Sequence, residues 1–197
     1  MRKITKENSI EYSVALINFD KSQVINITTM VMELGVYYDI FSNSITCDLL
    51  IKDGVGLVER FPIVGDEKIL MKIRTAGEKK YLNFEFDAYK ISTRKMVEER
   101  VHVFVLHGIT PYTTLNNITT VPKSYKSTPI SDIVSSVYSE YLSSAGDKSI
   151  EVEPTNGLYS IVAAHRTPFE LISVLSKEAQ SSQYKLSSSY LFYEDDD

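Results

Sequence analysis

Alternation of apolar and polar residues with a period of two is the feature that most restricts how this chain folds. In the stretch 44–51, SITCDLLI, every second residue is apolar, the pattern of a strand with one buried face. The stretch 81–91, YLNFEFDAYKI, repeats it, and TAGEKK before it is typical of a turn. Residues 67–91 are therefore predicted to form a β-hairpin.

Two further stretches are predicted strands with irregular patterns. Residues 23–38 are too long for an average strand and their apolar residues change face, which predicts a bulge near Thr28. Residues 101–108, VHVFVLHG, have no clearly polar face, so this strand is expected to be covered on both sides. At least six strands and a single short helix before Pro111 favour an antiparallel barrel or a sandwich.

The stretch 51–75 leaves the sheet, winds once and returns to it. Its two early glycines, short run of helix formers and following proline indicate an excursion of the backbone with no obvious nucleophile or metal ligand. Pro62 and Gly65 are expected to turn the chain back into the sheet. The side chains expected to plug one end of the barrel are Leu57, Val58 and Phe61.

Helical spacing replaces the strand pattern after Pro111. Residues 127–142 predict an amphipathic helix, with Thr128 as its cap and Pro129 at its first position. A second helix begins near Thr167, which has the spacing of a capping box with Glu170. Short strands are predicted at 149–154, 159–164 and 189–194. The expected fold class is thus α+β, with a barrel domain over 1–110 and an α+β domain over 111–197 that is either whole or truncated.

Composition excludes several classes of protein. At 43% hydrophobic, 197 residues can bury a substantial core, and no apolar run has the roughly 18 residues of a membrane helix. The first residues lack the apolar stretch of a secretion signal, so synthesis in the cytoplasm is expected. A formal net charge of −5 argues against a dedicated nucleic-acid binder. The terminal YEDDD lacks the spacing of a calcium loop.

No pattern indicates catalysis, a metal or a cofactor. His102 and His107 are five residues apart on a predicted strand, so they point to opposite faces, and His165 has no partner at a ligand spacing. None of the serines lies in a G-x-S-x-G motif. Cys47 is expected to be buried. Conservative changes at these histidines or at Cys47 are therefore expected to alter stability or nothing.

The order of the predicted elements along the chain resembles that of a known protein family. A barrel interrupted by DGVGLVERFPIVGDEKILMKI, then TPISDIVSSVYSEYL, then TPFELISVLSKEA followed by YLFYED, resembles the central hub protein of the baseplate in contractile-tailed, T-even-like bacteriophages. The likeness covers nearly the whole chain. Its most specific parts are the PIVGDE turn and the late helix with its aromatic and acidic end.

The resemblance implies a non-enzymatic structural role in the virion, in the tail baseplate. Such hubs form a trimeric ring that joins the tail tube to the spike and forms part of the DNA conduit. Expected partners are other copies of the chain, tail tube and spike proteins, and DNA in transit, with no membrane. The family continues into a second barrel, which is expected to lie beyond Asp197.

An acidic protein suits a conduit, since a Lys- or Arg-rich wall would bind the phosphate backbone. Asp48, Glu85 and Asp87, on polar strand faces, are the candidate lumen-facing acids. Two other classes remain open. One is a small-ligand-binding β-barrel, supported by 13 tyrosines and eight phenylalanines, and the other is a cell-wall hydrolase.

Overall fold

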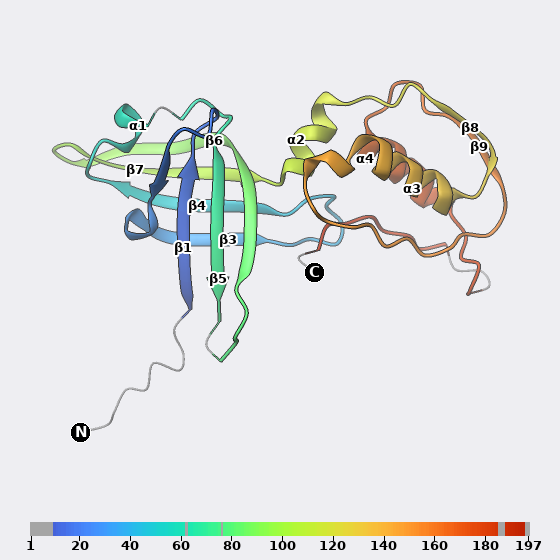
Figure 1. Ribbon diagram of the computed structural model, residues 1–197, viewed down its shortest axis with the longest axis horizontal. Helices are drawn as coiled ribbons and strands as arrows, with labels where there is room; N and C mark the ends of the chain where they lie inside the picture. The colour runs from blue at the N-terminus through green and yellow to red at the C-terminus, as the bar shows by residue number, and fades with distance from the viewer. Residues whose placement is uncertain (1–9, 62, 76, 185–187, 196–197) are drawn as a thin grey trace. The chain divides into compact units, whose positions relative to one another are not determined.

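The structure is a computed structural model (Figure 1) that describes residues 10–61, 63–75, 77–184 and 188–195. The chain divides into two compact units, each described here by itself. Over the described residues, the first unit consists of 10–37 and 46–110, and the second of 38–45 and 111–195. The fold is α+β, with a large curled antiparallel sheet in the first unit and helices with a two-stranded sheet in the second.

The first unit is a seven-stranded antiparallel sheet with strand order β2-β1-β5-β6-β7-β4-β3. The hairpin predicted over 67–91 is confirmed, because β5 and β6 pair in antiparallel register. The strands are β1 (Glu11–Ile17), β2 (Val24–Asn26), β3 (Val31–Tyr37), β4 (Thr46–Asp53), β5 (Lys68–Arg74), β6 (Leu82–Glu98) and β7 (Val101–Ile109).

Strand β6 curls the sheet. Its first part pairs with β5 and the rest pairs with β7, with register shifts after Ala88, Ser92 and Met96. Irregularities of this kind bend a strand and increase its twist. Figure 1 shows the result: β1 and β5 run across the direction of β4 and β7.

The two end strands of the sheet, β2 and β3, are consecutive in the chain. A 3₁₀ turn, η1 (Thr28–Met30), separates them at the place where a bulge was predicted, and a register shift follows between Val31 and Glu33 in the β3–β4 pair. Thr28 anchors the turn to β1, where its Oγ1 accepts a hydrogen bond from the backbone N–H of Val14 at 2.9 Å. The continuous segment 24–37 thus pairs with β1 through β2 and with β4 through β3.

The inner face of the sheet holds the core of the first unit. Cys47, Leu49 and Ile51 are completely buried, as the alternation in β4 predicts. On β7, Phe104 and Leu106 are buried while the intervening residues are half-buried, so cover on both faces was overestimated for this strand. Neighbouring strands add further fully buried side chains: Val14, Leu16, Ile69, Met71 and Phe86.

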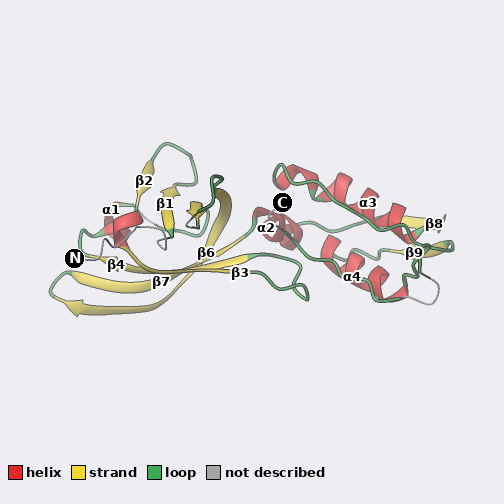
Figure 2. Cartoon of the chain, turned by 90° about the horizontal axis from the view of Figure 1, so that it is seen from below, coloured by secondary structure: helices red, strands yellow, loops and turns green. Residues whose placement is uncertain are grey.

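The second unit packs helices over a small sheet. Strands β8 and β9 pair in antiparallel fashion, and α3 packs against α4 (Figure 2). The core is built from one face of each of these helices, including Ile133, Val137, Leu171 and Leu175. The elements are α2 (Pro111–Ile118), β8 (Ser124–Thr128), α3 (Ile130–Tyr141), η2 (Ser143–Ala145), β9 (Tyr159–Val162) and α4 (Pro168–Glu178).

Of the two helix caps predicted from the sequence, one is confirmed and the other is wrong. The capping box of α4 is confirmed, because Thr167 Oγ1 accepts from the N–H of Glu170 while a Glu170 oxygen accepts from the N–H of Thr167. The cap predicted at Thr128 is wrong: Pro129 is the N-cap of α3, and the Thr128 hydroxyl donates to the carbonyl oxygen of Lys126.

Strands in this unit were harder to predict. The strand at 159–164 is confirmed as β9, but 149–154 and 189–194 form no strand among the described residues. The sequence pattern missed α2 and β8, since PYTTLNNI is largely polar and SYKST has no apolar alternation.

Candidate functional site

The excursion between β4 and β5 contains the residues expected to plug the barrel. It includes a single helical turn, α1 (Leu57–Arg60), and the side chains of Leu57 and Phe61 are 3% and 1% exposed. Pro62 lies outside the described residues. Gly65 has φ of 108°, a conformation that side chains with a Cβ rarely adopt.

A buried carboxylate holds the start of the excursion. Asp53, 1% exposed, accepts hydrogen bonds from the backbone N–H groups of Val55 at 3.0 Å and Leu57 at 2.7 Å. These donors precede or begin α1 and have no partner within the helix. Asp53 therefore fixes the point at which the chain leaves β4.

A second buried carboxylate holds the end of the excursion. Glu67 is completely buried and accepts from the backbone N–H groups of Val64 and Gly65, each at 2.9 Å. Neither acid was predicted from the sequence to have this role. The available signal was an acid directly beside each glycine-containing turn, where carboxylates commonly bind backbone N–H groups.

Two of the three candidate lumen acids share one lysine. Lys68 Nζ lies 2.6 Å from Asp87 and 3.2 Å from Glu85, across the β5–β6 pair. Burial opposes the charge of Lys68, but the hydrogen bonds and negative charges of Asp87 and Glu85 outweigh it and raise its pKa. The single positive charge of Lys68 therefore offsets part of the negative charge of this pair.

The third acid belongs to a chain of hydrogen bonds across three strands. Asp48 on β4 lies 2.6 Å from His107 Nδ1 on β7, and His107 Nε2 lies 2.6 Å from the Ser92 hydroxyl on β6. The ring of Tyr89 lies beside the imidazole, with centroids 6.1 Å apart. The sequence could not show this arrangement because its members come from separate segments.

The other residues considered from the sequence, which are His102, His165 and Cys47, do not come together in one site. Cys47 is buried, and burial together with the charge of Asp48 raises the pKa of its thiol to about 12, which keeps it protonated. Within the described residues, no cluster of three or more His, Cys, Asp or Glu side chains could hold a metal ion.

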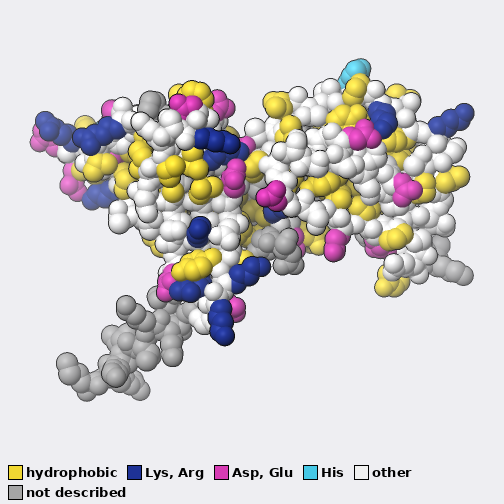
Figure 3. Space-filling view, in the orientation of Figure 1, with side chains coloured by type: hydrophobic (Ala, Val, Ile, Leu, Met, Phe, Trp, Pro, Cys, Tyr) yellow, Lys and Arg dark blue, Asp and Glu magenta, His cyan; other side chains and the backbone are white. Residues whose placement is uncertain are grey.

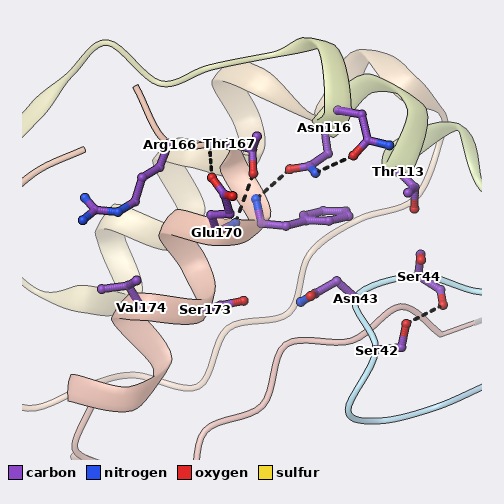
Figure 4. Close-up of a pocket in the computed structure, with 12 residues that line it drawn as sticks. Ser42, Asn43, Ser44, Thr113, Asn116, Arg166, Thr167, Glu170, Ser173 and Val174 are labelled. Carbon is purple, nitrogen blue, oxygen red and sulfur yellow. Dashed lines mark hydrogen bonds between the residues drawn. The ribbon is translucent and has the colours of Figure 1, made fainter. Parts of the chain in front are cut away.

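A polar pocket of about 680 Å³ lies in the second unit (Figure 4). Its charged members, Arg166 and Glu170, are both used within the protein: Arg166 donates to the carbonyl oxygen of Ala163, and Glu170 belongs to the capping box. A glycosidase needs two carboxylates facing each other, and the pocket lining holds one. Hydroxyl and amide side chains make up much of the rest: Ser42, Asn43, Ser44, Thr113, Asn117 and Ser173.

The surface charge is mixed in sign. On the face drawn in Figure 3, Lys and Arg side chains are interspersed with Asp and Glu over the first unit. An affinity for nucleic acid requires clustered basic side chains, which this face does not present. Among the described helices, none has both the length and the apolar character needed to cross a membrane.

The fold of this chain is similar to that of solved tail proteins. The chain is similar to the 43 kDa tail protein of prophage MuSo2 from Shewanella oneidensis, with TM-score 0.57, 14% identity, and coverage of 86% of this chain and 48% of that one. It is also similar to a tail protein from Neisseria meningitidis MC58, with TM-score 0.50, 9% identity, and coverage of 84% and 44%.

The chain therefore spans about half the length of these tail proteins. No protein-family model matches the sequence. No curated protein matches it either. The likeness is thus one of fold.

Proposed function

We propose that the chain is a structural component of a phage-type tail and serves as the central hub of the baseplate. The observation that carries this proposal is the likeness in fold to a prophage tail protein over 86% of the chain. The order of elements in the sequence supports the hub in particular, because it resembles that of T-even-like hubs.

The physical character of the first unit supports a structural role. Its inner face is filled by large, completely buried side chains such as Phe86 and Phe104, which leaves the sheet as a packed wall. Two buried carboxylates hold the excursion through four backbone hydrogen bonds. A rigid wall of this kind suits a part that must transmit force without changing shape.

The partners follow from the hub role. The chain is proposed to form a trimer within the virion, to contact the tail tube on one side and the spike on the other, and to meet DNA in transit. Asp48, Glu85 and Asp87 remain the candidate lumen-facing acids. Because Lys68 offsets part of the charge of Glu85 and Asp87, the expected effect on passing DNA is a weak repulsion.

The test is the position of the chain in assembled particles. Cryo-electron microscopy of tails that carry a small tag on this protein should place its density at the junction of tube and spike, around the tail axis. Density on the tail fibres, the sheath or the capsid would contradict the hub. A turbidity assay on purified peptidoglycan should show no clearing, and clearing would favour the hydrolase alternative.

A further inference from the structure

With Asp48 ionised and the His107 imidazole neutral, the two hydrogen bonds of the ring fix its tautomer. An ionised Asp48 carboxylate can only accept, so His107 Nδ1 must donate to it across their 2.6 Å contact. In the neutral imidazole, Nε2 then has no proton and must accept from the Ser92 hydroxyl at 2.6 Å. The imidazole is thereby oriented as a base toward a serine oxygen.

The three side chains lie on one face of three adjacent strands. Asp48 is directly opposite His107 in the β4–β7 pair, and Ser92 is opposite Val105, two residues before His107. This face is the outer one, because Cys47, Leu106 and Gly108 on the other face are buried. The side chains of His107 and Asp48 are 19% and 40% exposed. His107 and Asp48 are therefore partly open to solvent, and Ser92 is half-buried beside them.

The backbone next to Ser92 is strained. Thr93 has φ of 53°, which is unfavourable for a β-branched residue, and the register between β6 and β7 shifts between Ser92 and Lys95. Both features concentrate at functional sites. The register shift also contributes to the bend of β6, whereas the positive φ of Thr93 places a β-branched residue in an unfavourable conformation directly after Ser92.

We propose that Ser92 is a nucleophile, activated by His107 and oriented by Asp48, that reacts with small carbonyl and phosphoryl esters. The Ser92 oxygen bonds to the carbonyl carbon of an ester and its proton passes to His107 Nε2. The carbon–alkoxy bond breaks and the alcohol leaves with that proton. Water then hydrolyses the acyl-serine, releasing a carboxylic acid and restoring Ser92. This activity is additional to the structural role and departs from the expectation that His107 acts only in stability.

Labelling with a fluorophosphonate probe tests the proposal on the whole 197-residue chain. The Ser92 oxygen forms a bond to phosphorus, the phosphorus–fluorine bond breaks, and fluoride leaves with the proton taken by His107. Peptide mapping by mass spectrometry should locate the adduct at Ser92. Ser92→Ala should abolish it, and Ser13→Ala, which removes an exposed serine of β1, should not.

Two variants test whether His107 and Asp48 activate Ser92 or only connect the three strands. Asp48→Asn and His107→Gln should each slow labelling by about 100-fold or more, because the imidazole loses its orientation or its base. Thermal unfolding followed by circular dichroism checks that each variant is folded. If the wild-type chain takes no label at Ser92, or if a folded Asp48→Asn variant labels at the wild-type rate, the proposal is wrong and the three side chains only join strands.

Discussion

The backbone N–H of Gly65 donates a hydrogen bond of 2.9 Å to the completely buried carboxylate of Glu67. The N–H of Val64 donates to the other oxygen of the same carboxylate at 2.9 Å. The carboxylate therefore stabilises a tight turn of the backbone just before β5.

Gly65→Val should destabilise the protein by about 1 kcal/mol or more, because φ of 108° at this position is unfavourable for a β-branched residue. Urea unfolding gives the difference in free energy. Val64→Ala, at a neighbouring side chain that is 69% exposed, is the matched control and should change little. Equal stability of the Gly65→Val variant and the wild type would show that the backbone relaxes without cost.

Glu67→Gln should cost about 1 to 3 kcal/mol, because the amide NH₂ of glutamine would face a backbone N–H donor in the buried site. Asp66→Asn makes the same chemical change at the preceding, exposed residue and serves as the control. Chemical denaturation of the two variants compares them directly. A smaller loss for Glu67→Gln than for Asp66→Asn would contradict the role of the buried carboxylate.

Gly108→Ala should destabilise the sheet by about 1 to 3 kcal/mol through overpacking. A Cβ at this position would lie 2.6 Å from Cys47 Sγ and 2.9 Å from Phe86 Cβ. In a double-mutant cycle, Cys47→Ala should cost less in the Gly108→Ala background than in the wild type, since it removes the nearer clash. Additive effects of the two substitutions would mean that Sγ is not the obstacle.

Thr167→Ala should destabilise the second unit by about 0.5 to 2 kcal/mol, because it removes the side-chain half of the capping box of α4. Thr128→Ala removes a threonine before α3 that makes no cap hydrogen bond to that helix. Thermal melts should therefore separate the two variants. Equal losses would indicate that the hydroxyl of Thr167 contributes nothing beyond that of an ordinary surface threonine.

The raised pKa of Lys68 predicts that the stability of the protein depends on pH in the alkaline range. Its pKa in the folded chain lies above the ordinary value of 10.5, so its contribution to stability is complete below pH 10.5 and is lost as the pH rises through the folded pKa. The difference in unfolding free energy between wild type and Lys68→Met should shrink over that range. Lys72→Met, at an exposed residue of the same strand, is the control. A difference that stays constant through the alkaline range would contradict the prediction.

Features that depend on neighbours along the chain could be predicted from the amino-acid sequence. The alternation in 44–51 identified the buried face of β4, where Cys47, Leu49 and Ile51 are fully buried. The Thr167 and Glu170 spacing located the start of α4. Both are local, because a strand's two faces and a helix's first turn are defined by residues one to four positions apart.

The order of strands in the sheet could not be predicted from the sequence. Asp48 and Ser92 are linked through His107 because β7 lies between β4 and β6, a strand order that no pattern within a single segment encodes. The roles of the buried acids Asp53 and Glu67 emerged only with the three-dimensional path of the excursion. Pairing of distant strands is selected by the packing of the whole core, whereas the periodicity of a segment describes only that one element.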